Sequence, residues 1–443
     1  MERREGFAYV RATGEDLMLK RLLVVLLVMV AAPVLAQPQP VASPALRGAA
    51  ERVVALLRGE AQPAAIFTPA FRAQVPEAQI QGVIAQFTAQ YGAVQGLQGV
   101  DPASAEAGVI HIRYERAIVH MQLAIEPAPP HLVQGLQLTG ADMAGDTMEA
   151  VLAELGALPG QVSFAVARLG DGAPVLTSSL GPDRALAIGS TYKLFILAEL
   201  SRQVQAGQRR WSDVVAVDRR SLAGGIVGGL PQGAPVTLHT LASLMISISD
   251  NSATDILLHV AGRENVERMM ATMGVRDPAR NRPLLSTLEL GLLKTAPAIS
   301  FALWQQADEA TRRQLLANEY AARDPSRINI ALFAGNPIRI DSVEWFASAS
   351  DLTRVMDWLR RHADESARAI LAINPGLPPQ QRGSHAYAGF KGGSEPGVAN
   401  LTYLVRTRAG GWYAVSLGWN NPAAPVDENR LAGLAARAVM LLR

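Results

Sequence analysis

The chain contains no cysteine among its 443 residues, and this absence excludes several kinds of chemistry. Without a thiol there is no disulfide framework, no cysteine nucleophile, no cysteine-ligated zinc and no lipid-modified N-terminal cysteine. An excess of charge is also lacking, because 41 Lys and Arg residues nearly balance 39 Asp and Glu residues and leave a net charge of +2. Broad binding of nucleic acid needs a basic face, so this balance argues against such a partner.

Histidine is scarce and scattered, which bears on metal binding. None of the 7 histidines belongs to a cluster with the spacing of metal ligands. His385 lies near Lys391, and we expect it to be a surface or supporting residue. The sequence therefore predicts neither a bound metal nor another cofactor.

Residues 1–36 have the pattern of an export signal, although no long hydrophobic run is present. Two basic residues precede an apolar segment from Leu22 to Val30, and small or short residues follow it. These three parts define a secretory signal. The apolar segment is short for spanning about 30 Å of hydrocarbon, so we expect cleavage, no stable membrane anchor and a periplasmic or secreted protein. Residues 1–17 lack signal character, and we expect translation to start at Met18.

A proline-rich tether at residues 37–45 follows the signal, and a first structural unit is expected at residues 46–142. We predict helices and then strands, at Arg47–Leu57, Pro76–Tyr91, Val109–Arg116, Ala117–Ile125 and Leu132–Thr139. This order predicts a small α+β domain, and it resembles the cone-shaped domain of ketosteroid-isomerase-like proteins. The unit offers no carboxylate pair for catalysis, and Glu115 and His120 are expected to be solvated or structural.

A second unit is expected at residues 146–443. It begins with a helix and two strands, contains two apolar helices, and ends with two strands and a helix. The expected bounds are Thr147–Leu155, Ser163–Leu169, Ala173–Leu180, Leu194–Leu200, Leu238–Ser247, Tyr403–Arg408, Trp412–Trp419 and 428–442. Extra sequence between Lys294 and Ile340 is expected to enlarge a helical lobe or to cover a cleft.

Three short motifs stand in the second unit in one order. They are Ser190-Thr191-Tyr192-Lys193, Ser249-Asp250-Asn251 and Lys391-Gly392-Gly393. Each motif alone is a weak signal, because S-x-x-K occurs about once by chance in a chain of this length. S-D-N is also a helix cap or turn, and K-G-G is an ordinary glycine turn. Their order, spacing and flanking residues together indicate one active site.

Ser190 and Lys193 have the spacing that nucleophilic catalysis needs. A serine hydroxyl reacts when a base removes its proton, and residues at i and i+3 of a helix share one face. Lysine is a base only when it is uncharged, and the apolar residues after Lys193 predict the burial that lowers its pKa. The N–H groups of Ser190 and Ser394 would form an oxyanion hole.

Together the three motifs are a signature of class A β-lactamases and penicillin-binding proteins. The residues around the second motif resemble class A enzymes almost residue for residue, and the resemblance covers about residues 146–443. It implies an α+β fold with a five-stranded antiparallel sheet and an all-helical lobe. It also implies the following roles: Ser190 as nucleophile, Lys193 as its base, Ser249 as proton relay, Asn251 as partner of the substrate's side-chain amide, and Lys391 as the cation for a substrate carboxylate, with Gly392, Gly393 and Ser394 beside the substrate. Asp250 is expected to face inward and to orient its loop.

Two positions depart from the class A pattern. Class A enzymes carry R-x-E-x-x-L-N after S-D-N, and its glutamate positions the water that releases the acyl group. The matching segment is Arg280–Ser286, where Arg282 stands in place of the glutamate, and arginine cannot act as a base. Glu289, three residues later, is expected to be solvated or salt-bridged. Gly392 replaces a threonine that binds the substrate carboxylate, and we hypothesise that Ser394 takes over part of that contact.

The order of the two units resembles the two-domain proteins of clavulanic acid gene clusters, whose hydrolase domain is linked to weak esterase activity on cephalosporins. Three functions stay open. The first is an exported serine hydrolase that opens β-lactams or related esters through an acyl-enzyme, with slow deacylation. The second is a D,D-peptidase acting on D-Ala peptides of the cell wall, and the third is a protein that β-lactams acylate without turnover. The sequence carries no signal for a particular oligomeric state.

Overall fold

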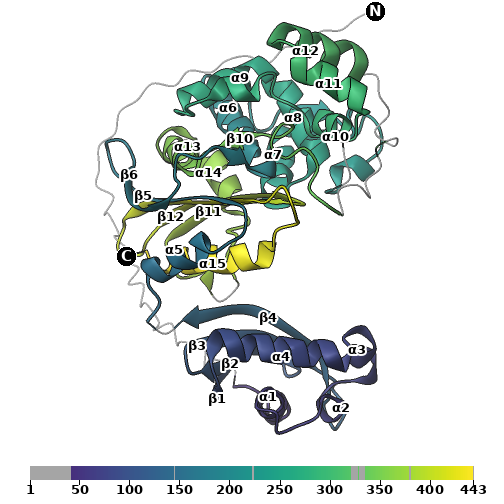
Figure 1. The fold of residues 1–443 in the computed structure, drawn as a ribbon, viewed down its shortest axis with the longest axis vertical. Coiled ribbons are helices and arrows are strands. Elements are labelled where there is room, and N and C mark those ends of the chain that lie inside the picture. The colour runs from purple at the N-terminus through teal and green to yellow at the C-terminus, as the bar shows by residue number, and fades with distance from the viewer. Residues whose placement is uncertain are drawn as a thin grey trace, which may run out of the picture. The chain divides into compact units, whose positions relative to one another are not determined.

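The computed structural model describes residues 41–143, 145–221, 224–320, 328, 335–378 and 381–442 (Figure 1). The expected export signal and most of the tether lie outside these described residues, so export and a start at Met18 stay predictions. Within the described ranges, no helix is both long and apolar enough to cross a membrane.

Residues 44–143 form helices that are followed by a four-stranded antiparallel sheet, with the strands paired in chain order. The elements are Pro44–Leu57 (α1), Pro63–Ile66 (α2), Pro69–Gln74 (α3), Glu77–Tyr91 (α4), Val94–Pro102 (β1), Ala107–Tyr114 (β2), Ala117–Ile125 (β3) and Val133–Met143 (β4). Ser43 and Thr68 accept hydrogen bonds from the first turns of α1 and α3. A proline follows each cap, where its missing N–H leaves no helical bond unmade.

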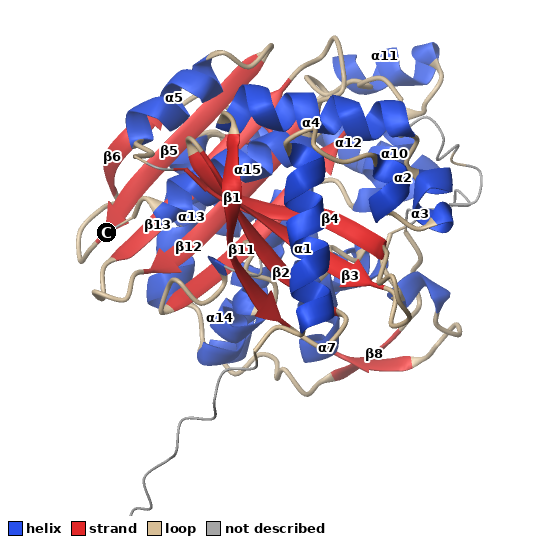
Figure 2. Ribbon diagram, turned by 90° about the horizontal axis from the view of Figure 1, so that it is seen from below, coloured by secondary structure: helices blue, strands red, loops and turns tan. Residues whose placement is uncertain are grey.

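One apolar core joins these helices and strands. Alternate residues of a strand point to the same side of a sheet, and α1 lies across β1, β2 and β3 (Figure 2). On that side, Ile110 and Ile112 of β2 and Val119 of β3 are fully buried with Leu46 of α1. Burying each such side chain contributes about 1.5–3 kcal/mol. This core consists of residues between Leu46 and Val133, so the region has a core of its own.

Strand β1 and the short helices α2 and α3 are the elements of this region that the sequence analysis does not predict. The pairing of β1 with β2 shifts register between Val94 and Gly96 and again between Leu97 and Gly99. Such bulges interrupt the alternation of apolar and polar residues by which a strand is recognised.

A row of four polar side chains crosses the sheet, one from each strand. Asp101 lies 2.9 Å from His111 Nε2, the Nδ1 atoms of His111 and His120 lie 2.6 Å apart, and His120 Nε2 lies 2.9 Å from Asp142. A carboxylate only accepts, so both Nε2 atoms donate and one proton between the Nδ1 atoms completes the row. The hydrogen bond from His120 lowers the pKa of Asp142. His120 is therefore a satisfied structural group and Glu115 is exposed, as the sequence predicts.

Residues 146–442 form a five-stranded antiparallel sheet with helices on both faces (Figure 1). Its strand order is β11-β12-β13-β5-β6, which are Tyr387–Glu395 (β11), Val398–Arg406 (β12), Trp412–Asn420 (β13), Gln161–Leu169 (β5) and Val175–Leu180 (β6). The two ends of this region therefore complete one sheet. Met148–Gly156 (α5) and Glu428–Met440 (α15) pack on one face of the sheet.

Alternation along the strands separates two apolar cores. On β12, Tyr403 and Val405 pack with α5 and α15, whereas Leu404 packs with the helical lobe. On β13, Val415 packs with α15 and Ala414 with the lobe. A sheet buried on both faces explains the nearly continuous apolar run of β12.

The helical lobe covers the other face of this sheet. Its helices are Lys193–Gln205 (α6), Leu238–Ser247 (α7), Asn251–Ala261 (α8), Arg263–Thr272 (α9), Thr287–Lys294 (α10), Ala298–Gln306 (α11), Glu309–Leu315 (α12), Ala349–His362 (α13) and Glu365–Ala372 (α14). Short helical turns lie at Gly189–Tyr192 (η1), Val227–Gly229 (η2), Pro278–Asn281 (η3) and Leu316–Tyr320 (η4), and two-stranded ribbons pair Leu186–Ala187 (β7) with Phe346–Ala347 (β10) and Val214–Ala216 (β8) with Pro235–Thr237 (β9).

The expected fold class is confirmed for residues 146–442: an α+β fold with a five-stranded antiparallel sheet and a helical lobe. The bounds of α7 coincide with the predicted helix Leu238–Ser247. The described part of the extra sequence between Lys294 and Ile340 contains α11 and α12, so it enlarges the lobe as expected. The likeness of the first unit to ketosteroid-isomerase-like domains stays a prediction.

Candidate active site

The three sequence motifs lie on three different elements. Ser190 lies in η1, which leads directly into α6 at Lys193. Ser249 lies between α7 and α8, whereas Lys391 lies in the middle of β11. Both lysines are buried, with Lys193 0% and Lys391 3% exposed. A buried lysine needs polar partners, because an unpaired charge inside a protein is costly.

Ser249 supplies partners to both lysines. Lys193 Nζ lies 2.7 Å from Ser249 O, 3.0 Å from Ser249 Oγ and 2.9 Å from Asn251 Oδ1. Lys391 Nζ lies 3.1 Å from the same Ser249 Oγ and also donates to Gly392 O. One hydroxyl therefore stands between two amines that come from distant parts of the sequence.

This arrangement favours the uncharged form of Lys193. Burial lowers the pKa of Lys391 to about 7. Burial and the neighbouring Lys391 lower the pKa of Lys193 well below its ordinary value, against the opposing charges of Asp255 and Asp250. Two cations around one hydroxyl oxygen repel each other, so the first proton is lost more readily than the second.

The hydrogen-bond partners of Lys193 can accommodate both its charged form and its neutral form. A neutral amine has two hydrogens, and Ser249 O and Asn251 Oδ1 can only accept them. The ammonium form donates its third hydrogen to Ser249 Oγ, whereas the lone pair of the neutral form can accept the Ser249 hydroxyl hydrogen while Lys391 donates to Ser249 Oγ. The three side chains thus form a short path for protons from Lys391 through Ser249 to Lys193.

Ser190 lies beside β11, and glycine makes this approach possible. A Cβ atom at Gly393 would overlap Ile188 O, Ser190 N and Thr191 N, which are all backbone atoms. Gly189 has a φ of +50°, and a Cβ there would lie 3.0 Å from Ser394 N. The structure therefore brings the backbones of Ser190 and Ser394 together, as an oxyanion hole requires.

The described residues give Ser190 Oγ no hydrogen bond, and the contacts of Lys193 all go to Ser249 and Asn251. A direct transfer of the hydroxyl proton from Ser190 to Lys193 stays a prediction. Catalytic hydrogen bonds are often formed only when substrate is bound.

Asp250 holds the loop that carries Ser249. It is fully buried, its Oδ2 accepts from the N–H groups of Ile226 and Val227 at 2.6 and 2.8 Å, and its Oδ1 accepts from Ala253 at 2.9 Å. Ser249 has a φ of +60°, which is a strained conformation for a residue with a side chain. These bonds hold that conformation, and the inward orientation expected for Asp250 is confirmed.

Asp255 supports the site, although the sequence analysis does not single it out. It accepts hydrogen bonds from Thr287 and Leu288 at the start of α10, at 2.8 and 3.0 Å. Burial raises its pKa. Asp255 lies four residues after Asn251 on α8, and that spacing places the two on one side of the helix. The spacing is the signal by which Asp255 could have been found.

The loop that departs from the class A pattern is held by an ion pair. Glu289 accepts two hydrogen bonds from Arg263, at 2.7 and 2.8 Å, and forms a capping box with Ser286 at the start of α10. The salt-bridged role expected for Glu289 is therefore confirmed. Its carboxylate is engaged in structure, so it does not replace the glutamate that is absent at Arg282.

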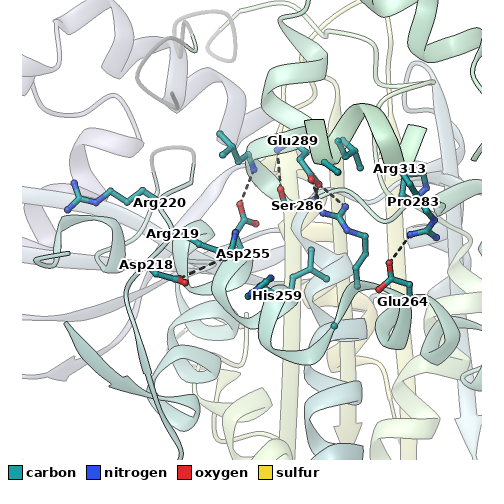
Figure 3. Close-up of a pocket in the computed structure, with 16 residues that line it drawn as sticks. Asp218, Arg219, Arg220, Asp255, His259, Glu264, Pro283, Ser286, Glu289 and Arg313 are labelled. Atoms are coloured by element: carbon teal, nitrogen blue, oxygen red, sulfur yellow. Dashed lines mark hydrogen bonds and ion pairs between the residues drawn. The ribbon is translucent and has the colours of Figure 1, made fainter. Parts of the chain in front are cut away.

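A pocket of about 1010 Å³ is lined in part by this loop, through Pro283, Ser286 and Glu289 (Figure 3). Its charged lining residues have both signs and are Asp218, Arg219, Arg220, Asp255, Arg263, Glu264, Glu289 and Arg313. None of the three motifs contributes to its described lining. Among the described residues, no group of three or more His, Asp or Glu side chains could hold a metal ion.

Comparisons with known proteins cover the region that contains the three motifs. The model of the β-lactamase enzyme family matches residues 146–439. A β-lactamase from Sphaerobacter thermophilus is 24% identical with a TM-score of 0.45, over 66% of this chain and 93% of that chain. PBP-A is 15% identical with a TM-score of 0.45, over 66% and 92%. A β-lactamase from Chitinophaga pinensis is 16% identical with a TM-score of 0.44, over 66% and 96%. No curated protein matches the chain.

Proposed function

The chain belongs to the β-lactamase enzyme family, and from this membership we propose that it is a serine hydrolase that opens β-lactam amides or related esters. The observation that carries the proposal is the convergence of Lys193 and Lys391 on Ser249 Oγ, at 3.0 and 3.1 Å. Such a pair supplies one neutral amine and one cation at the same hydroxyl. That combination suits acyl transfer to the neighbouring Ser190.

Acylation then proceeds in two steps. Lys193 takes the proton of Ser190 Oγ while Oγ bonds to the carbonyl carbon, and the N–H groups of Ser190 and Ser394 stabilise the resulting oxyanion. The intermediate collapses when the carbon–nitrogen bond breaks. The proton passes through Ser249 Oγ to the leaving nitrogen, so the products of this stage are an amine and an ester on Ser190.

Deacylation is the slow stage in this proposal. Water must add to the ester carbonyl and give its proton to a base before Ser190 leaves. At the position of the class A glutamate stands Arg282, which cannot accept a proton. Lys193 or Ser249 is then the group left to activate the water. This feature also favours a second function, in which a β-lactam acylates Ser190 without efficient turnover.

Lys391 gives the site a preference for substrates with a carboxylate. Its charge attracts an anion, but Gly392 offers no hydroxyl to bind one. A carboxylate held by charge alone is positioned less firmly than one that also accepts a hydroxyl hydrogen bond. Both β-lactams and D-Ala peptides carry such a group.

One experiment separates the possible functions. Purified protein is incubated with a chromogenic cephalosporin and, in parallel, with a peptide ending in D-Ala-D-Ala. Continuous colour development supports a β-lactamase. A single burst that ends at one equivalent supports a protein that stays acylated. Release of D-alanine without reaction of the cephalosporin supports a D,D-peptidase and contradicts the proposed function.

The charge of Lys391 makes acylation by an anionic β-lactam dependent on pH. A lysine with a lowered pKa is charged only below that value, which is about 7 for Lys391. We expect the second-order rate constant for acylation to fall as pH rises above 7, by up to about tenfold per pH unit. A rapid-mixing measurement with the cephalosporin and with its methyl ester tests this. The uncharged ester should show no such fall, and a fall of equal size for both compounds would contradict the role of the charge.

A further inference from the structure

One face of β11 carries two residues of the active site and, next to them, a residue outside the three motifs. Alternate residues of a strand share a face, and the pairing of β11 with β12 has no register shift. Lys391 on this face contacts Ser249, and Gly393 on the same face packs against the backbone of Ser190. Glu395 occupies the next position on this face, about 7 Å further along the strand.

Glu395 belongs to a buried cluster of three charged side chains. The Nζ atom of Lys294 contacts the Glu395 carboxylate, lies 3.3 Å from Glu344 Oε1 and donates to Ile338 O at 3.0 Å. The side chains of Lys294 and Glu344 are 0% and 1% exposed, and that of Glu395 is 13% exposed. Water therefore contributes little to the solvation of these charges, and each charge is stabilised mainly by the other side chains of the cluster.

The charges of the cluster balance when it holds one extra proton. Two carboxylates and one ammonium would leave a buried net charge of −1. Burial and the nearby Glu344 raise the pKa of Glu395, against the attraction of Lys294. A proton on Glu395 makes the cluster neutral. Buried ionic clusters of this kind add little stability, and their clearest effect is to fix geometry.

Each residue of the cluster is connected to a different motif through the chain or through direct contacts. Glu395 follows Ser394, the expected oxyanion-hole donor on β11. Glu344 precedes Trp345, whose carbonyl accepts from Ile188 N at 2.9 Å and whose ring stacks on Tyr192 at 3.7 Å. These two contacts hold the residues on both sides of Ser190.

Lys294 completes the connections through α10. It is the last residue of that helix, and the first turn of the helix is bound by Asp255. Asp255 lies one helical turn after Asn251 on α8. The cluster therefore joins the segments that carry the nucleophile, the S-D-N loop and the K-G-G strand, although no motif contributes a residue to it.

We propose that Lys294, Glu344 and Glu395 form a positioning cluster that fixes the oxyanion end of β11 against Ser190. The proposal rests on the acyl-enzyme function proposed above. These residues act through the backbone that they hold and do not touch the substrate. Loosening the cluster should slow acylation even when the protein stays folded.

The decisive variant is Glu395→Leu, because leucine has nearly the size of glutamate, cannot bind Lys294 and leaves the ion pair of Lys294 with Glu344. The matched control is Glu199→Leu. Glu199 is also buried and paired with a cation, but its partners Arg202 and Gln203 lie on its own helix. For both variants we measure the melting temperature, the acylation rate constant and the affinity for phenylboronic acid. This probe bonds to an active serine and places an oxygen in the oxyanion hole.

We expect Glu395→Leu to lower the acylation rate constant and the phenylboronic acid affinity by about ten- to a hundredfold, because small displacements of catalytic groups have effects of this size. Glu199→Leu should change only the melting temperature. If Glu395→Leu also changes only the melting temperature, the cluster is merely structural and the proposal is overturned.

A further readout separates this proposal from the proposed function. If the unaltered protein neither binds phenylboronic acid nor becomes acylated, the proposed function fails. Hydrogen exchange of the Gly393 and Ser394 amides then tests the cluster alone. Faster exchange in Glu395→Leu supports a positioning role, and unchanged exchange overturns it.

Discussion

Gly393→Ala is expected to lower the acylation rate constant by at least about a hundredfold, the effect of losing one oxyanion-hole donor. The added Cβ atom would overlap Ile188 O, Ser190 N and Thr191 N. Backbone atoms inside a buried turn cannot rotate away as a side chain can, so β11 must move off the Ser190 turn. The N–H groups of Ser190 and Ser394 would then no longer converge. Rapid-mixing kinetics with a chromogenic cephalosporin measure the effect.

Gly392→Ala is the matched control for this prediction. A Cβ atom there would lie 2.9 Å from Phe390 Cζ and 3.3 Å from Leu401 Cδ2, which are the far ends of side chains that can adjust. We expect acylation to stay within a few-fold of the unaltered protein, consistent with the small cost of modest repacking. If the acylation rate constant fell equally in the two variants, the close approach of Gly393 to Ser190 would have no special importance.

Lys193→Met is expected to lower the acylation rate constant by a hundredfold or more, since a positioned base contributes about 10²–10⁴-fold. Methionine keeps most of the length of the side chain but has no lone pair of comparable basicity. It also removes the contacts at 2.7 and 2.9 Å to Ser249 O and Asn251 Oδ1. Circular dichroism checks that the variant is folded before its rate is compared.

Lys193→Arg distinguishes a base from a cation at this position. Arginine keeps the positive charge and donates hydrogen bonds, but it does not lose its proton in proteins. We therefore expect Lys193→Arg to be as slow as Lys193→Met. Recovery of acylation by arginine would mean that the site needs a charge at residue 193 and not a base.

The catalytic roles of the motif residues could be predicted because they depend on residues that are only a few positions apart in the sequence. Ser190 and Lys193 stand one helical turn apart, and burial of Lys193 follows from the apolar residues after it. The helix Leu238–Ser247 was predictable because its apolar spacing is regular and Thr237 caps it. A signal within a few residues is enough for predictions of this kind.

Contacts between distant segments could not be predicted from the sequence. Lys294, Glu344 and Glu395 meet only because α10, the segment before β10 and the end of β11 are brought together in the fold. The residues next to each of them in the sequence give no sign of burial, so each looks like a charged side chain exposed to solvent. The sharing of Ser249 Oγ between two lysines is of the same kind, since a motif names the residues but not the direction of their hydrogen bonds.

Covalent modification of Ser190 is the direct test of the proposed function. The protein is mixed with a penicillin, quenched with acid, and its intact mass and the masses of its proteolytic peptides are recorded, with Ser190→Ala treated in parallel. We expect one added penicillin on the peptide that contains Ser190, and none in Ser190→Ala. An adduct on another residue, or an equal adduct in both proteins, would contradict an acyl-enzyme at Ser190.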